Sequence, residues 1–505
     1  GQPKSYYQFS NLIGSGSVVL YDLTNQKRIK VNQNGGNYNC LIPNTGNQKQ
    51  CVIGFSSEID TVSSLLPING TGFFTDYNAL NPDTAFVIIT HSSLLNEANN
   101  YANYRLTSFN NPQNAVVFDI EELYDQFSYG IEQHPYAIRG FIDFALDNWS
   151  SNPKYLLLFG KSVKANEVRN NTANFAKNLV PSYGHPATDH MLLSGLNGSI
   201  YEPPVPMGRV SALTPYHAQL YLNKVIDFEN LIPNQLNSSN GESEWMKKAL
   251  HFSGGQSQNA ANLFLSYLNG FENTLKDTLF GGSVKTFSKL TSQPIEVTIT
   301  DSIKQFIGNG VALMTFFGDG SATGGFDQNL DDPVNWPEQN GKYPLLIGNA
   351  CLTGDIHLST ANSTSEKFVL IEDKGVIGFL ASVDLGFSNY LNSYTSELYK
   401  NISYKSYGES IGIQMNKTIQ FLQGTGTNTY MRSTVLGMTL HGDPSVVINS
   451  FPKPDYMINQ NSIYFTPSIV TSDLDSFDVN IVIANLGNAT NANMILELTR
   501  IFPNS

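Results

Sequence analysis

The alternation of hydrophobic and polar residues predicts short strands at the start of the chain. Ser17 to Tyr21 and Arg28 to Val31 alternate apolar with polar side chains and are separated by turn-forming residues, as antiparallel strands do. We therefore expect residues 1–78 to form a β-rich segment that is part of a sandwich. Cys40 and Cys51 flank a turn-rich stretch and are expected to face each other across a hairpin, as a disulfide or as free thiols.

Continuous apolar runs replace this alternation after residue 79. Ala85 to Ile89 and Tyr155 to Phe159 are such runs, Ala115 to Ile120 is a further predicted strand, and stretches with helical spacing separate them. Buried strands that alternate with helices are typical of a parallel sheet covered on both faces. Residues 79–240 are therefore expected to form a first αβ subdomain.

A second αβ series follows a seam rich in Asn, Gly and Pro at Pro233 to Gly241. Trp245 to Phe252 opens it, and its predicted strands are Ala312 to Phe317, Leu345 to Asn349 and Gly375 to Ala381. We expect residues 241–450 to form a second αβ subdomain, either fused to the first or built as an inserted half of one sheet.

Alternation returns in residues 451–505. Ser462 to Thr466, Asp478 to Ala484 and Asn493 to Leu498 alternate as immunoglobulin-like strands do. About 55 residues are too few for a complete sandwich, so we expect a truncated one and a chain that is a fragment of something longer. The predicted fold class is α/β with β segments on both sides.

The charge balance argues against two classes of main partner. Asp and Glu number 42 against 29 Lys and Arg, for a net charge of −13, whereas nucleic acids and anionic membranes are bound by clustered cations. No apolar run reaches the roughly 18 residues that a membrane-spanning helix needs. Zinc-binding spacing and a phosphate-binding loop are also missing from the sequence.

Two predicted strands end in turns of small residues, where αβ sheets place their ligands. The residues directly after these strands are Gly318, Asp319 and Gly320 in one turn and Ala350 and Cys351 in the other. Glycine lets backbone N–H groups approach a reacting atom, as an oxyanion hole requires. Cys351 is therefore either a nucleophile at a strand tip or, as lone cysteines more often are, a small buried apolar residue.

Further motifs occur in a characteristic order over residues 80–450. They are Phe86 to Thr90, Phe127 to Gly130, Ala137 to Arg139, Leu156 to Gly160, Tyr183 to Asp189, Met207 to Val210, Asn349 to Cys351, Gly378 to Ser382 and His441 to Pro444. In order and spacing they resemble the gingipain-type (C25) cysteine peptidases, relatives of the caspases, and among them the Bacteroidetes proteins related to the type IX secretion signal peptidase. The resemblance implies a caspase-like domain of two αβ subdomains.

The same resemblance implies a function. It indicates a cysteine endopeptidase homologue that is secreted or held at the bacterial cell surface, associated with the outer membrane. Its expected partners are a protein or peptide substrate, including C-terminal secretion signals, and type IX secretion components. It implies no required cofactor. Calcium is common in the family, so the acidic loop with Asp319, Asp327, Asp331 and Asp332 is a candidate calcium site, although its spacing does not match an EF-hand.

One position departs from the family pattern. The family reads Gly-His-Gly at the first strand end, and this histidine pairs with the cysteine. The resemblance places Cys351 at the nucleophile and Asp319 at the histidine. An aspartate pKa of about 3.9 lies about 4.6 units below a thiol pKa of about 8.5, so proton transfer costs roughly 6 kcal/mol, and a neighbouring anion raises the thiol pKa.

Three interpretations stay open. Another histidine supplies the base, with His357, six residues after Cys351, as the main candidate and His441 and His185 as further ones. Alternatively, the chain is a catalytically inactive pseudopeptidase that serves as a binding or assembly component for secreted proteins. Finally, Asp319 replaces a natural histidine by design. The family's supporting acid is also missing from residues 254–257, which read Gly-Gly-Gln-Ser, and this second loss favours the pseudopeptidase.

Overall fold

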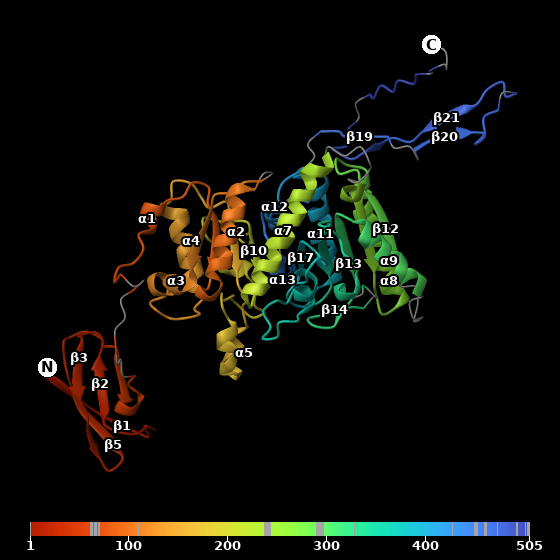
Figure 1. Ribbon diagram of the computed structural model, residues 1–505. Helices are drawn as coiled ribbons and strands as arrows, with labels where there is room; N and C mark the ends of the chain where they lie inside the picture. The colour runs from red at the N-terminus through yellow and green to blue at the C-terminus, as the bar shows by residue number, and fades with distance from the viewer. Residues whose placement is uncertain are drawn as a thin grey trace. The chain divides into compact units, whose positions relative to one another are not determined.

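The computed structural model describes residues 2–60, 64, 68, 71–108, 111–236, 244–288, 297–327, 330, 332–426, 428–448, 453–458, 462–471, 473–490, 493–499 and 501. It divides into two compact units, residues 1–73 and 74–505. Figure 1 shows both units, and each is described by itself.

The first unit consists of two three-stranded antiparallel sheets. One contains β1 (Lys4–Ser10), β5 (Asn37–Pro43) and β4 (Asn32–Asn34), and the other β3 (Lys27–Lys30), β2 (Val18–Asp22) and β6 (Cys51–Phe55). Leu20 and Ile29 of one sheet pack against Cys40 and Ile42 of the other. The expected sandwich is confirmed.

The predicted hairpin between the two cysteines is wrong. Cys40 lies on β5 opposite Tyr7, whereas Cys51 lies on β6 opposite Asp22. The chain crosses from one sheet to the other between these strands, so the two residues are not cross-strand neighbours. Both are free thiols, Cys40 buried and Cys51 exposed.

The second unit is built on one ten-stranded sheet. Its order is β12 (Ser283–Ser288), β11 (Lys248–Ser253), β13 (Leu313–Phe317), β16 (Leu345–Asn349), β17 (Gly378–Ser382), β18 (Met438–His441), β10 (Met207–Val210), β9 (Tyr155–Phe159), β7 (Phe86–Thr90) and β8 (Ala115–Asp119). Neighbours are parallel from β12 to β17 and from β10 to β8, and β17 and β18 are antiparallel. Both predicted αβ series therefore share a single sheet.

Burial explains which strands the sequence predicts. β7, β9, β13, β16 and β17 are buried at every residue, as strands covered on both faces are. β12 is an edge strand with mostly polar, partly exposed residues, so its sequence lacks the apolar run and it was missed.

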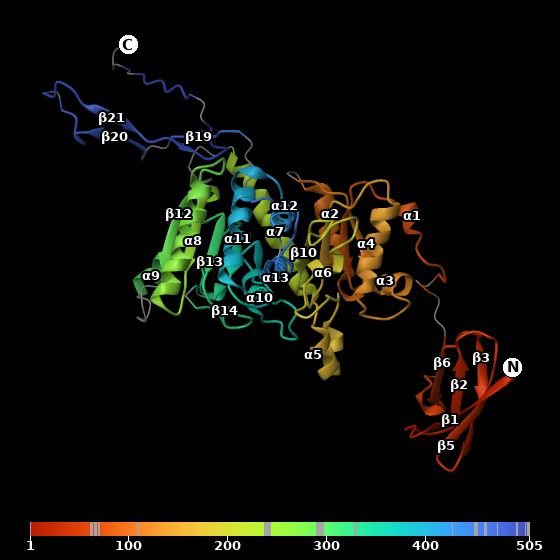
Figure 2. The same ribbon diagram turned by 180° about the vertical axis from the view of Figure 1, so that it is seen from behind.

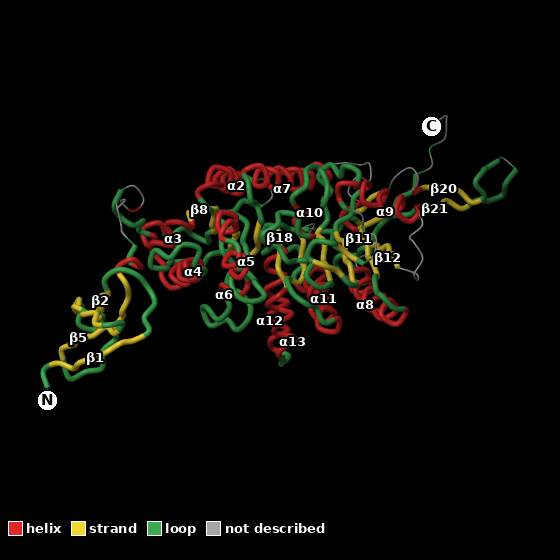
Figure 3. Tube along the Cα trace, turned by 90° about the horizontal axis from the view of Figure 1, so that it is seen from below, coloured by secondary structure: helices red, strands yellow, loops and turns green. Residues whose placement is uncertain are grey.

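Helices cover both faces of the sheet. In Figure 3, α2 (Leu95–Thr107) and α7 (Pro215–Leu236) lie on one face, and α4 (Tyr136–Asn148), α12 (Ile411–Gly424), α13 (Thr429–Gly437), α11 (Ser388–Lys400) and α8 (Gln258–Lys276) lie on the other. The remaining helices are α1 (Tyr77–Leu80), α3 (Ile120–Phe127), α5 (Ala165–Asn170), α6 (His190–Leu193), α9 (Val297–Asn309) and α10 (Thr364–Val369). Among the described residues, no helix has the length and apolarity to cross a membrane. The predicted seam overlaps the end of α7 and otherwise lies outside the described residues.

The C-terminal segment shows only part of the expected immunoglobulin-like sandwich. It contains two antiparallel pairs, β20 (Ile463–Thr466) with β21 (Asp478–Ile481) and β19 (Tyr456–Met457) with β22 (Ala484–Asn485). The strand predicted from Asn493 to Leu498 is wrong, because residues 493–499 are described and form no strand.

Candidate active site

The two predicted strand tips lie side by side. β13 and β16 pair in parallel with Phe317 opposite Asn349, and beyond them Gly318 N–H donates to the Asn349 carbonyl at 3.2 Å. A Cβ added at Gly320 would lie only 2.9 Å from the Ala350 Cβ. Because glycine has no side chain, the two tips can approach each other this closely. The segments that carry Asp319 and Cys351 therefore adjoin, and both residues are partly exposed.

The sulfur of Cys351 has a backbone donor. Gly386 N–H donates to Cys351 Sγ at 3.3 Å, and the sulfur lies 3.8 Å from the Gly386 carbonyl oxygen. This contact ties the sulfur to the loop that follows β17. Within the described part of the chain, the Cys351 backbone N–H has no protein acceptor. It is thus available to a reacting carbonyl oxygen, as the prediction of an oxyanion hole around Ala350 and Gly320 requires.

A carboxylate that the sequence analysis missed lies at the same tips. The short hairpin of β14 (Gly320–Ser321) and β15 (Gly325–Phe326) returns the chain, so that Asp327 accepts from Asp319 N–H at 3.1 Å and from Gly255 N–H at 2.8 Å. A Cβ at Gly254 would lie 2.1 Å from Asp327 Oδ1. Because Gly254 has no side chain, the carboxylate of Asp327 fits against residues 254–257, the stretch that lacks the family's supporting acid.

The candidate calcium loop contains this hairpin. Asp327 binds backbone N–H groups, Asp332 caps a short helix through Val334 N–H, and Asp331 lies outside the described residues. No group of three or more His, Cys, Asp or Glu suited to a metal occurs among the described residues. Calcium binding stays a prediction.

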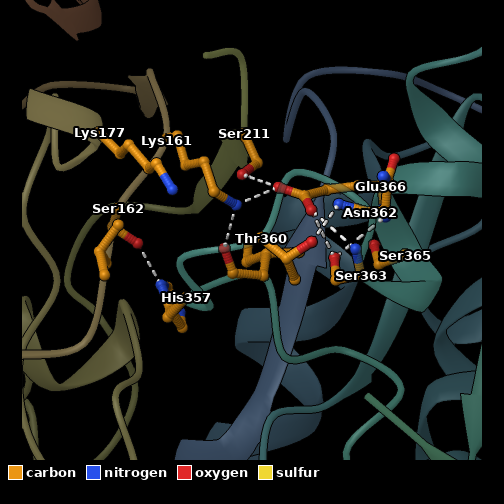
Figure 4. Close-up of polar contacts among 12 residues, drawn as sticks. Lys161, Ser162, Lys177, Ser211, His357, Thr360, Asn362, Ser363, Ser365 and Glu366 are labelled. Carbon is orange, nitrogen blue, oxygen red and sulfur yellow. Dashed lines mark hydrogen bonds and ion pairs between the residues drawn. The ribbon is translucent and has the colours of Figure 1, made fainter. Parts of the chain in front are cut away.

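The candidate base His357 belongs to a different environment. Its ring is buried, and Nδ1 is hydrogen-bonded to Ser162 Oγ, as Figure 4 shows. Burial lowers the pKa of His357 to about 3, because the charged imidazolium would lose its hydration. None of the contacts of the ring found in the described residues involves Cys351. The structure does not bring His357 and Cys351 together.

The other two candidate histidines, His441 and His185, do not contact the Cys351 thiol among the described residues. His441 is buried, with Nδ1 at 2.8 Å from Ser365 Oγ and Nε2 accepting from Ser211 N–H at 3.2 Å. Burial lowers its pKa. His185 is exposed in the loop before α6. No described contact joins either histidine to Cys351.

A buried group of polar residues, which we call the Glu366 cluster, fixes the loop after Cys351. The Lys161 ammonium and Ser211 Oγ donate to Glu366 Oε1, and Ser363 Oγ and N–H donate to Oε2 at 2.9 Å (Figure 4). Lys164 N–H donates to the His357 carbonyl at 2.9 Å. The loop that starts at Cys351 is thus bonded to the residues that follow β9 and β10.

Exposed apolar side chains continue from the residue that touches the thiol. Leu385 and Phe387 flank Gly386 and are 63% and 43% exposed. Phe387 packs edge-on against Tyr430 with ring centroids 4.7 Å apart, and Tyr390 stacks on Tyr430. We call Leu385, Phe387, Tyr390 and Tyr430 together the aromatic wall. It offers apolar surface to a ligand beside Cys351.

Comparison with known proteins identifies the family. The model of peptidase family C25 matches residues 79–449, a range that includes both strand tips, the Glu366 cluster and the aromatic wall. The chain belongs to peptidase family C25. No curated protein matches the sequence of this C25 chain.

Solved structures agree with this C25 fold. The complex of the pro- and mature domains of RgpB from Porphyromonas gingivalis aligns with a TM-score of 0.57 and 15% identity over 74% of this chain and 82% of that one. The Arg-specific cysteine proteinase gingipain R (RgpB) aligns with a TM-score of 0.56 and 15% identity over 75% and 82%. Latent PorU from Porphyromonas gingivalis covers 92% of this chain and 38% of its own, at a TM-score of 0.43 and 14% identity. At these identities the first two structures support the fold alone.

Proposed function

We propose that this C25 chain binds an extended peptide at the tips that carry Cys351 and Asp319 without turning it over at a peptidase's rate. The observation that carries the proposal is that the tip beside Cys351 presents a carboxylate, while the rings of His357 and His441 are buried and bonded elsewhere. The chain then acts as a pseudopeptidase, a binding or assembly component derived from a peptidase.

The chemistry of the pair supports this reading. Asp319 is a weak base for a thiol, because proton transfer against a difference of about 4.6 pKa units costs roughly 6 kcal/mol. The aromatic wall supplies an apolar contact for a bound peptide. The Cys351 N–H, which has no acceptor among the described residues, supplies a donor for a peptide carbonyl.

A slow cysteine peptidase is the second candidate, and the contact of Gly386 N–H with the sulfur favours it. In that reaction the Cys351 sulfur attacks the scissile carbonyl carbon, and the thiol proton passes to Asp319 and then to the leaving amine. Water hydrolyses the resulting thioester and regenerates the thiol. Backbone N–H groups of the tips bind the oxyanion.

Turnover of a peptide library by three variants separates the candidates. We expect the wild type to bind peptides but to cleave no faster than Cys351→Ala. Asp319→His restores a base and should raise turnover about 100-fold or more above Cys351→Ala, and the double variant Asp319→His/Cys351→Ala should be silent. Wild-type cleavage that Cys351→Ala abolishes would establish the slow peptidase instead.

We also propose a place for the chain in a type IX secretion pathway, secreted or at the outer membrane of a bacterium. The motif resemblance of residues 80–450 supports this proposal, with C-terminal secretion signals as candidate ligands. Binding of synthetic C-terminal signal peptides to the wild type tests it. Failure of these peptides where library peptides bind would contradict the secretion role and leave peptide binding intact.

A further inference from the structure

A hollow lies on the β7–β10 side of the ten-stranded sheet, away from the strands β13 and β16 that carry the Cys351 site. It has a volume of about 440 Å³ and lies between the start of α4, the helix α6 and the loop at Tyr183. Figure 2 shows α4 and α6 near each other in this half. A hollow of this size suits a small ligand, and no residue of the Cys351 site lines it.

The walls of the hollow are largely apolar. Tyr136 and Tyr183 are half-exposed, at 49% and 50%. Pro135, Met191 and Leu192 add further apolar surface, and the His134 ring, whose Nδ1 accepts from Tyr136 N–H, also lines the hollow. Tyrosines that expose their rings at a hollow offer rigid apolar surface with a polar end, a combination enriched in binding sites.

One cation lines the hollow. Arg139 Nη1 donates to the carbonyls of Leu192 and Ser194, both at 3.0 Å, which fixes the guanidinium. Within the described residues its Nε and Nη2 have no acceptor, and it forms no ion pair. By contrast, the buried Arg105 and Arg209 are paired with carboxylates.

Among the described residues no carboxylate lines the hollow, although acidic residues outnumber basic ones 42 to 29 in the chain. A positioned guanidinium with unused donors binds planar oxyanions in a bidentate manner. The charge of the hollow is therefore complementary to an anion, and its walls are complementary to an apolar group.

We propose that this hollow binds a carboxylate carried on an apolar body, as at the C-terminal residue of a peptide. Arg139 Nε and Nη2 take the two carboxylate oxygens, and Tyr136, Tyr183 and Met191 enclose the apolar side chain. The site is separate from the Cys351 tips, so it stands whether or not the peptide-binding proposal above holds.

Calorimetric titration with matched ligands tests the proposal. Acetyl-Ala-Phe with a free carboxylate should bind at least about tenfold more tightly than its amide. 3-Phenylpropionate distinguishes the source: equal affinity would assign the site to free organic acids, and weaker binding would assign it to peptide ends. Equal binding of the acid and the amide would overturn the proposal.

Variants localise the effect. Arg139→Met should abolish the preference for the acid, and Tyr183→Ala should weaken binding about threefold. Arg432→Met removes an exposed arginine that lies 5.2 Å above the Tyr201 ring and should change nothing. If Arg139→Met fails to fold, the acid–amide comparison with Tyr183→Ala decides, and full acid binding by a folded Arg139→Met would refute the site.

Discussion

The Glu366 cluster and the Cys351 tips follow strands of the same sheet but differ in how their polar groups are satisfied. In the cluster, Glu366 receives donors from Lys161, Ser211 and Ser363, and all are buried. At the tips, Cys351 and Asp319 are partly exposed. The cluster contains the residue types expected of an active site, yet its burial and mutual bonding make it a structural support, whereas the exposed tips are accessible to a ligand.

The largest expected effect concerns the cluster. Glu366→Ala leaves the Lys161 ammonium buried without its partner, which should lower the free energy of unfolding by about 3–5 kcal/mol. Chemical denaturation followed by circular dichroism measures this loss. Glu372→Ala, at an exposed glutamate that accepts from Tyr216, is the control and should stay within about 0.5 kcal/mol.

A small effect of Glu366→Ala would show that the cluster is solvated and would remove its contrast with the tips. The double variant Lys161→Met/Glu366→Met provides a second check. Replacing both partners with apolar side chains should recover much of the lost stability.

The next effect is a pH dependence of stability due to His357. Its folded pKa of about 3 lies below the unfolded value of about 6.5, so between these values only the unfolded chain binds the proton and stability falls as the pH drops. His357→Gln should therefore reduce the loss of stability between pH 7 and pH 4.5 by about 2–3 kcal/mol.

Denaturation midpoints at the two pH values measure this difference. His185→Gln, at an exposed histidine, is the control and should lose stability as the wild type does. An unchanged pH dependence in His357→Gln would mean that the ring is hydrated, and His357 would again be a candidate base.

The aromatic wall gives a smaller effect. Phe387→Ala removes one aromatic side chain beside the Cys351 tip and should weaken binding of library peptides about threefold, while loss of its contact with Tyr430 should lower the free energy of unfolding by no more than about 1.5 kcal/mol. Tyr216→Ala, at an exposed tyrosine on α7, is the matched control. Equal affinities of the two variants would show that peptides do not use the wall.

The strand tips were predictable from the sequence because local signals determine them. Leu345 to Ile347 is an apolar run that leads through Gly348 and Asn349 into a turn of small residues, and β16 spans Leu345–Asn349. A buried strand that ends in such a turn places Cys351 at the carboxyl end of the strand. The family motifs predicted the fold because several of their residues make contacts that stabilise the core. Arg209 forms a buried ion pair with Asp189, and Asp443 forms one with Arg105.

Long-range pairing explains what the sequence did not reveal. Lys161 and Glu366 are 205 positions apart, and no periodicity links them. Asp327 reaches the tips through two strands of two residues each, too short for a detectable alternation. His357 lies close to Cys351 in sequence, but its buried ring is hydrogen-bonded to Ser162, which follows β9 in the other half of the sheet.

The pH dependence of Cys351 alkylation by iodoacetamide tests the central claim most directly, because it reports whether a base is paired with the thiol. A Cys51→Ser background removes the other exposed cysteine and leaves Cys40 buried. We predict that the wild type is alkylated slowly at pH 7 because its thiol lacks a paired base, and that Asp319→His, which supplies one, is alkylated at least about tenfold faster at that pH. A thiolate that forms below about pH 7 in the wild type would contradict the account.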